Sequence, residues 1–368
     1  MTFSQRTCAA ALLMASTLAA NVTISNTRLR RTRLGSVVGA QDGNLANAKH
    51  DGQFVLVGMS YGDCVYTACS NETLGACGFG PGRILVWTSA TLADGTWSEP
   101  WEILPASDRP SNSIYFRPHA VFNPSSKKWV LWVRYETVRG PHLSDDPTGY
   151  LSAVADSLEG PFVVAHANVT MHFANSADDN LFVDDTDGRG YIVHTARGTG
   201  MKVVVERLSP DFTYSLGATS AAERSDLIGP GGTEAPALFR RGTSYFVTMA
   251  KDCCYCAEGS ATMVFVSQTG PLGPYAPAGS LGNAPGAQQN FVLSGPILGH
   301  DQVLWSGNRW GSDPVNHPPR FDNSLQYWTL LEFASANESR SGGSSGSISA
   351  VAPIKEIRWQ DAVVLQVG

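Results

Sequence analysis

Hydrophobic positions in this chain recur in short runs bounded by turn residues, and no segment keeps the 3.6-residue period of an amphipathic helix. One unit returns five times: a turn rich in Gly, Asp, Ser or Lys, followed by a run of aromatic and β-branched residues. The five runs are residues 51–58, 126–133, 187–194, 241–247 and 299–305. Each run predicts the core of a β-hairpin, and the spacing of roughly 55–75 residues is typical of propeller blades.

A second repeated element lies between these hairpins. It is a Gly-Pro or Glu-Pro turn followed by an aromatic residue, at residues 97–101, 157–162 and 270–275. Such segments are typical of the outer strands of sheets that need neighbours to bury their faces. Five units without intervening helices predict an all-β fold, a five-bladed β-propeller; a β-sandwich or two all-β domains is the alternative.

The ends of the chain differ from this pattern. Residues 1–20 resemble a signal peptide, with Arg6, an apolar run at 8–18 and the small residues Ala19 and Ala20. A buried N-terminal helix is the alternative. The chain from residue 21 onward would be the mature protein.

Three further segments complete the predicted organisation. Residues 21–36 are polar and basic and predict a loose lead-in, whereas residues 37–368 predict a single propeller domain. Residues 335–349 are rich in Ser and Gly and predict a flexible insert. Residues 353–368 have a strand pattern and would close the ring.

Composition excludes several partners. The 368 residues are 43% hydrophobic, enough for a large core, and the formal charge of −6 offers no basic patch for nucleic acid. No stretch after the N-terminus approaches the roughly 18 apolar residues of a membrane span. We expect a monomer that interacts with neither nucleic acid nor membrane.

Cysteine usage and glycosylation sequons indicate a secreted protein. Six cysteines follow the predicted leader, at 64, 69 and 77 and at 253, 254 and 256, and sequons begin at 21, 71, 168 and 337. An even number of cysteines in an oxidising compartment predicts disulfides, with the pairing left open. A zinc site is the alternative, but no nearby histidine completes a usual ligand set.

Three acidic residues precede predicted inner strands. Glu234 follows a Gly-Pro-Gly-Gly turn, and Asp178 lies before a strand whose later pair, Asp184 and Asp185, belongs to a hairpin turn. Asp42 also precedes a strand, with an ordinary Asp-Gly turn as the alternative.

Carboxyl groups that converge on a propeller funnel suit glycoside hydrolysis. One acid protonates the leaving oxygen, a second carboxylate activates water or attacks, and a third keeps the acid protonated through like-charge repulsion. Tyr61, Tyr255, Trp305 and Trp310 are candidates to stack on sugar rings, with packing between blades as the alternative for each.

Six segments in the same order resemble glycoside hydrolase family 43, most closely its exo-β-1,3-galactanase subgroup. They are Arg-Pro-His-Ala-Val-Phe-Asn at 117–123, Ser-Ala-Asp-Asp-Asn-Leu-Phe at 176–182, Glu-Ala-Pro-Ala-Leu-Phe at 234–239, Gln-Gln-Asn-Phe-Val at 288–292, Gly-Asn-Arg-Trp at 307–310 and Tyr-Trp-Thr-Leu-Leu-Glu-Phe at 327–333. The resemblance covers residues 38–365 and implies a five-bladed propeller glycosidase that inverts the anomeric centre.

The resemblance also implies roles for single residues. Glu234 matches the general acid, Asp178 the carboxylate that tunes it, and Asp42 the usual general base. Gln288 matches a glutamine that is thought to hold the water in the galactanase subgroup, so Asp42 and Gln288 both stand as candidates for the base.

Substrate contacts are implied at five positions, which are Arg117, Phe116, Tyr61, Trp310 and Arg309. Phe116 stands where the subgroup has a glutamate, so the sugar is left open among galactan, arabinan and xylan types. A catalytically impaired carbohydrate-binding propeller is the alternative function. The resemblance allows a structural calcium, but the sequence predicts no metal ligands.

Overall fold

The computed structural model describes residues 20–367 except 67–81, 112, 140–141, 252–255, 257–258, 284, 300–301 and 335–353. The predicted leader up to residue 19 and the predicted insert at 335–349 therefore lie outside the described residues. The described chain is built from β-strands and short 3-10 turns.

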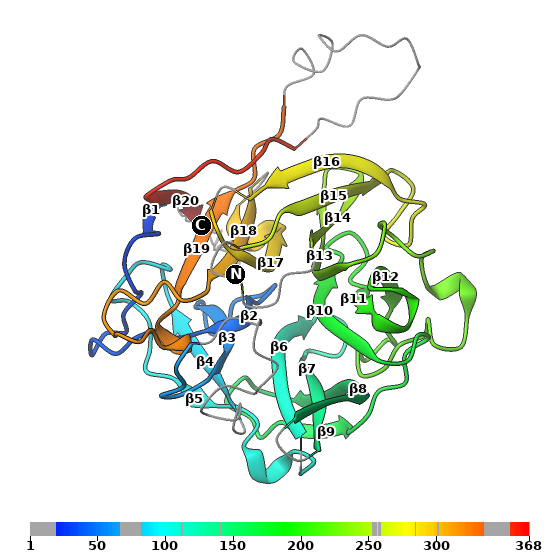
Figure 1. Cartoon of the computed structure of the whole chain (residues 1–368), viewed down its shortest axis with the longest axis horizontal. Helices are drawn as coiled ribbons and strands as arrows, with labels where there is room; N and C mark the ends of the chain where they lie inside the picture. The colour runs from blue at the N-terminus through cyan, green and yellow to red at the C-terminus, as the bar shows by residue number, and fades with distance from the viewer. Residues whose placement is uncertain are drawn as a thin grey trace, which may run out of the picture.

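Five antiparallel sheets surround a common axis, and the first strand of each sheet lies innermost (Figure 1). The strands of the first two blades are β2 (Gln41–Leu45), β3 (Phe54–Ser60), β4 (Arg83–Ser89) and β5 (Trp101–Glu102), then β6 (Ser113–Asn123), β7 (Lys128–Arg139), β8 (His142–Ala155) and β9 (Val163–His166). Blade three has β10 (Ser176–Val183), β11 (Gly190–Ala196) and β12 (Lys202–Arg207). The last two blades have β13 (Thr233–Arg241), β14 (Ser244–Lys251), β15 (Thr262–Ser267) and β16 (Ala276–Gly282), then β17 (Gln288–Ser294), β18 (Val303–Arg309) and β19 (Leu325–Leu330). The predicted five-bladed propeller is confirmed.

Each repeated hairpin core is the second strand of a blade. These strands are β3, β7, β11, β14 and β18, and each pairs antiparallel with the innermost strand of its own sheet. The Pro-aromatic segments precede β5, β9 and β16, the outer strands of the three four-stranded blades. The two repeated sequence elements therefore mark the second strand and the outer strand of a blade.

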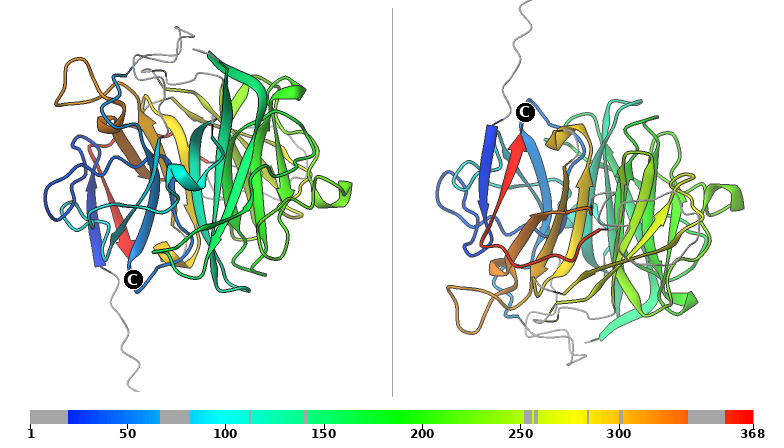
Figure 2. Two further views of the ribbon diagram at one scale, coloured as in Figure 1. Left: turned by 90° about the horizontal axis from the view of Figure 1, so that it is seen from below. Right: turned by 90° about the horizontal axis from the view of Figure 1, so that it is seen from above.

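The two ends of the described chain form a sheet of their own. β1 (Ala20–Ser25) pairs antiparallel with β20 (Ala362–Val367), from Ala20 opposite Val367 to Ser25 opposite Ala362. Figure 2 shows the two strands side by side at one flank of the propeller. The predicted loose lead-in over residues 21–36 is therefore wrong for its first part, because residues 21–25 alternate exposed and buried positions and bury Val22 and Ile24.

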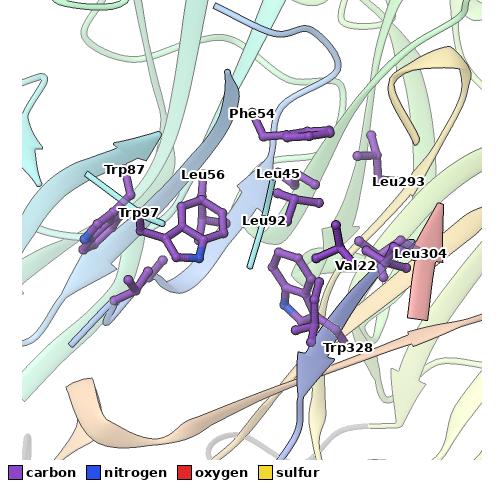
Figure 3. Close-up of a cluster of buried hydrophobic side chains, with 14 of the residues drawn as sticks. Val22, Leu45, Phe54, Leu56, Trp87, Leu92, Trp97, Leu293, Leu304 and Trp328 are labelled. Atoms are coloured by element: carbon purple, nitrogen blue, oxygen red, sulfur yellow. The ribbon is translucent and has the colours of Figure 1, made fainter. Parts of the chain in front are cut away.

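The terminal sheet closes the ring through its apolar face. Val22 and Leu365 join one buried cluster with Phe54 and Trp87 of blade one and Trp328 of blade five (Figure 3). Burial of large apolar side chains stabilises a fold by roughly 1.5–3 kcal/mol each. This cluster therefore joins the first and last blades without a strand shared between them.

The state of two cysteines and the absence of a membrane-spanning helix can be stated for the described residues. Cys64 and Cys256 are both disulfide-bonded. Among the residues that the structure describes, no helix has the length and apolar character needed to cross a membrane.

Candidate active site

A β-bulge interrupts the pairing of all five innermost strands. In β2, Gln41 lies opposite Met59 and Asn44 opposite Val57, so β2 carries one more residue than β3 over this interval. The same single-residue excess follows residues 116, 176, 234 and 289 in the other four blades. Bulges redirect side chains and recur beside active sites.

The bulges place the predicted acidic residues at the axis. Asp42 and Arg117 have φ values of 53° and 46°, and Ala235, next to Glu234, has a φ of 47°. Left-handed backbone at non-glycine residues is uncommon and clusters at functional sites. The Asp42-Gly43 pair is thus part of a bulged strand, and the alternative of an ordinary turn is wrong.

Glycine at position 43 is required by close backbone packing. A Cβ atom there would lie 1.8 Å from the carbonyl oxygen of Val57 and 2.6 Å from the Cα of Gly58. A side chain at position 43 would therefore clash with β3, so the strand that carries Asp42 needs glycine here.

Asp42 is buried and held by two neighbours. The Tyr61 hydroxyl donates a hydrogen bond of 2.5 Å to Oδ2, and Arg117 Nη2 lies 4.0 Å from Oδ1. Burial raises the pKa of Asp42, while Arg117 and Tyr61 oppose that rise. A carboxylate with a raised pKa is a stronger base than an ordinary surface aspartate.

Asp178 lies between two arginines. Arg117 Nε is 3.2 Å from its Oδ2, Arg134 Nη1 is 3.0 Å from its Oδ1, and the backbone N–H of Ala235 donates to Oδ2 at 3.2 Å. Burial alone would raise the pKa of Asp178, but the guanidinium groups of Arg117 and Arg134 outweigh it and hold the pKa below its usual range. Asp178 is therefore an ionised carboxylate beside the strand that carries Glu234.

Glu234 is joined to Gln288 and, through it, to Trp310. Gln288 Nε2 donates to Glu234 Oε1 at 2.7 Å, and Trp310 Nε1 donates to Gln288 Oε1 at 2.8 Å. Both ends of the Gln288 amide are thus engaged, and its position is beside the acid. Glu234 itself is only 7% exposed.

Three predicted substrate contacts have different surroundings from those expected. Trp310 is 1% exposed and packs edge-on against Phe321, so it orients Gln288 and presents no face to a sugar. The guanidinium of Arg309 lies 4.6 Å from the centroid of the Trp359 ring. Tyr61 stacks on Phe321 with its hydroxyl directed at Asp42.

Phe116 and Trp305 also pack within the protein. Phe116 is 5% exposed and contacts Met59 and Ile114, with the Arg134 guanidinium 5.3 Å from its ring. Trp305 is buried and donates to the side chain of Gln289. Arg117 lies between Asp42 and Asp178 and contacts both carboxylates. Tyr255, another candidate for stacking on a sugar, lies outside the described residues.

Sequence reasoning missed three charged residues that are connected to Asp178 through successive ion pairs. Arg134 and Glu136 interrupt the apolar run of β7, and Arg197 follows β11 in the short turn η2 (Arg197–Thr199). The signal for Arg134 and Glu136 was available, since charged residues inside a strand buried on both faces need partners. For Arg197 no sequence signal exists, because its partner lies 61 positions earlier in the chain.

A buried histidine and a buried aspartate lie next to each other in the sequence neighbourhood of Arg117 and Asp178. His119 and Asp179 are fully buried below Asp178, with His119 Nδ1 3.9 Å from Asp179 Oδ2. Burial raises the pKa of Asp179 and lowers that of His119 to about 3, so both groups are held neutral. Among the described residues, no group of three or more His, Cys, Asp or Glu side chains is arranged to hold a metal ion.

Asp322 supports the loop that carries Tyr61. Its carboxylate accepts hydrogen bonds from Ser60 Oγ at 2.6 Å, from the Tyr61 N–H at 2.5 Å and from the Gly62 N–H at 3.0 Å. Burial nevertheless raises the pKa of Asp322 to about 6. The folded state therefore holds this proton more tightly than the unfolded chain does, which stabilises the fold below pH 4, and this stabilisation is lost as the pH rises through 6.

We expect the wild type to lose about 2–3 kcal/mol of unfolding free energy between pH 4 and pH 7 relative to Asp322→Asn, since one pKa unit corresponds to about 1.4 kcal/mol. Urea denaturation of both proteins at the two pH values measures this difference. Parallel pH dependence of the two proteins would contradict it.

Comparison with known proteins gives a family match over part of the chain. Residues 142–290 match the model for glycosyl hydrolases family 43. The search of curated proteins gave no match.

Solved structures share the fold over most of the chain. A family 43 β-1,3-galactosidase has a TM-score of 0.66 at 20% identity, with 93% of this chain and 63% of that chain covered. An exo-β-1,3-galactanase from Clostridium thermocellum has a TM-score of 0.70 at 19% identity and covers 94% and 67% of the two chains. One from Phanerochaete chrysosporium, solved with β-1,3-galactotriose, has a TM-score of 0.67 at 16% identity and covers 93% and 68%. This chain is therefore similar to glycosyl hydrolases family 43 over residues 142–290, and it shares its propeller fold with these solved structures.

Proposed function

We propose that this protein is an inverting glycosidase that acts on β-1,3-linked galactan. The observation that carries the proposal is the convergence of Asp42, Asp178 and Glu234 from three blades, each carboxyl buried and held by a named partner. Buried carboxyls in different electrostatic surroundings divide the roles of acid and base between them.

Each residue has one role in this proposal. Glu234 protonates the glycosidic oxygen while the bond from that oxygen to the anomeric carbon breaks. Asp42 accepts a proton from water as the water attacks the same carbon from the opposite face. Asp178 stays ionised and disfavours loss of the proton from Glu234. The attack inverts the configuration, so a β-linkage releases an α-sugar.

The contacts of Gln288 favour Asp42 as the base. Gln288 is committed to Glu234 and Trp310, on the side of the acid. Asp42 instead contacts Tyr61 and Arg117. Base and acid must flank the sugar in an inverting enzyme.

The substrate class rests on the galactanase and galactosidase neighbours. Incubation with β-1,3-galactotriose, arabinobiose and xylobiose, followed by proton NMR of the first products, tests both substrate and stereochemistry. We expect α-galactose to appear first and to mutarotate later. Release of β-galactose, or hydrolysis of only the arabinan or xylan substrate, would contradict the proposal.

A binding propeller without catalysis is the second candidate, and Phe116 favours it. Its apolar side chain replaces a polar contact where the resemblance implies a glutamate. Loss of one charge-assisted hydrogen bond costs about 1.5–3 kcal/mol, roughly ten- to a hundredfold in affinity. Calorimetric binding of β-1,3-galactotriose without any product after prolonged incubation would select this candidate.

Removal of the Tyr61 hydroxyl should leave less of the base ionised at acidic pH. Tyr61→Phe takes away a hydrogen bond that favours ionised Asp42, so the pKa of Asp42 rises further. We expect the acidic limb of the pH–activity profile to move upward by about one unit and kcat at pH 5 to fall about tenfold. The matched control is Tyr214→Phe, an exposed tyrosine of blade three. An unchanged acidic limb would exclude Asp42 as the base.

We also propose that the protein is exported. The leader-like residues 1–20 and the disulfide-bonded Cys64 and Cys256 support this location. Cleavage after Ala20 would retain the β1 residues from Asn21 to Ser25. N-terminal sequencing of protein recovered from the medium of expressing cells is the test, with Asn21 as the expected first residue.

A further inference from the structure

A chain of alternating charges runs outward from the proposed base. It passes from Asp42 to Arg117, Asp178, Arg134, Glu136 and Arg197, and each residue contacts the next. The first three belong to innermost strands, whereas the last three lie on the second strand of blade two and on η2 of blade three. Glu136 is the one acidic residue of this series that lies on a second strand and not on an innermost strand.

Glu136 joins two arginines through one oxygen. Arg134 Nη2 and Arg197 Nη2 both donate to its Oε1, the latter at 3.0 Å. The Glu136 side chain is 4% exposed, so little water screens the contact. Two guanidinium groups this close repel each other unless an anion lies between them.

Both arginines act on Asp178, Arg134 through direct contact and Arg197 through its charge. Arg134 Nη1 contacts Asp178 Oδ1, and the backbone carbonyl of Asn175, three residues before Asp178, accepts a hydrogen bond from the N–H of Arg197 at 3.2 Å. Arg134 also lies over the ring of Phe116, which gives it no hydrogen-bond acceptor. Glu136 therefore anchors Arg134 on the side away from Asp178.

We propose that Glu136 is a positioning residue that holds Arg134 and Arg197 behind Asp178 and offsets their positive charge at the acid–base centre. The effect on Glu234 rests on the proposed function. Without the offset, a net positive charge behind Asp178 favours loss of the Glu234 proton.

The charged and titratable groups around Glu234 come from several elements. They are Asp42 on β2, Arg117 on β6, Arg134 and Glu136 on β7, Asp178 and Asp179 on β10, Arg197 on η2 and Lys251 on β14. Asp179 is held neutral, and Lys251 is exposed and thus screened by solvent. The net charge near Glu234 is therefore set by the series of alternating charges from Asp42 to Arg197.

The experiment uses the full chain with Glu136→Gln, Arg197→Gln and the double variant. A glutamine at position 136 can still accept both hydrogen bonds, so the substitution removes charge with little change in shape. Glu223→Gln is the matched control, because Glu223 pairs with Arg207 at a partly exposed position elsewhere on blade three. Thermal melts verify that each variant is folded.

Two readouts are needed. Carbon-13 NMR of labelled aspartate, assigned with Asp178→Asn, follows the titration of the Asp178 carboxyl without any need for activity. The pH–activity profile follows the acid. In Glu136→Gln we expect the Asp178 midpoint and the upper limb of activity each to fall by about one unit. We expect the double variant to restore both and Glu223→Gln to match the wild type.

The two proposals fail separately. If the Asp178 midpoint is the same in Glu136→Gln and wild type, the role of Glu136 is overturned whatever the activity. If the midpoint falls as expected but wild type hydrolyses none of the substrates, the role of Glu136 stands and the proposed function fails. A fall that the double variant does not reverse would also overturn the charge-offset role.

Discussion

Glu234→Gln is expected to lower kcat on β-1,3-galactotriose by about a thousandfold, because general acid catalysis contributes roughly a hundred- to ten-thousandfold. Glutamine keeps an oxygen that can accept the hydrogen bond from Gln288, so the local structure should persist. What it lacks is a transferable proton. KM should change little.

The leaving group provides a sharper test of this role. A dinitrophenyl β-galactoside needs little protonation of its leaving oxygen, so Glu234→Gln should lose less than about tenfold in rate on that substrate. Initial rates on both substrates, with Glu223→Gln as the control, measure the contrast. Equal losses on the two substrates would show that Glu234 is not the acid.

Arg117→Met is expected to lower the unfolding free energy at pH 7 by about 3–5 kcal/mol, the usual cost of breaking a buried ion pair on one side. The Arg117 side chain is only 3% exposed and lies between Asp42 and Asp178. Without it, two carboxyls of like charge remain buried at the axis. Methionine fills much of the same volume, so the loss reports charge more than packing.

The pH dependence distinguishes charge from packing at this position. The pKa of Asp178 is held low in the wild type, so the stability that it contributes is present above about pH 4 and is lost as the pH falls further. The deficit of Arg117→Met should therefore shrink toward acidic pH, as seen by urea denaturation at pH 7 and at pH 3.5. Arg117→Lys keeps the charge and should lose less. A deficit independent of pH would indicate a packing defect instead.

The strand order of the propeller was predictable because it follows from local pattern. Each second strand carries a continuous aromatic and β-branched run after a turn, as at Trp129–Val133 of β7, and such runs are buried between blades. The terminal sheet was only half predictable. Residues 362–367 have a strand pattern, but residues 20–25 become a strand by pairing with them across the whole length of the chain.

The roles of the aromatic residues could not be predicted from sequence. Tyr61 and Trp310 were expected to meet sugar, yet their polar atoms donate to Asp42 and Gln288. The residue type of an aromatic side chain does not indicate whether it faces a ligand or a carboxyl group of the protein. Its direction is set by residues such as Phe321, which packs against both rings.

The sequence by itself determined that five hairpin units would form a ring and that Asp42, Asp178 and Glu234 would precede or begin its inner strands. It could do so because strands and turns are encoded by residues close together in the chain. Only the tertiary structure decided how those carboxyls are charged. The five bulges bring Arg117 between Asp42 and Asp178, and Arg134, Glu136 and Arg197 meet behind them from two blades. Protonation at a buried site depends on the distances between charges, and these distances are fixed only when the blades pack around the axis.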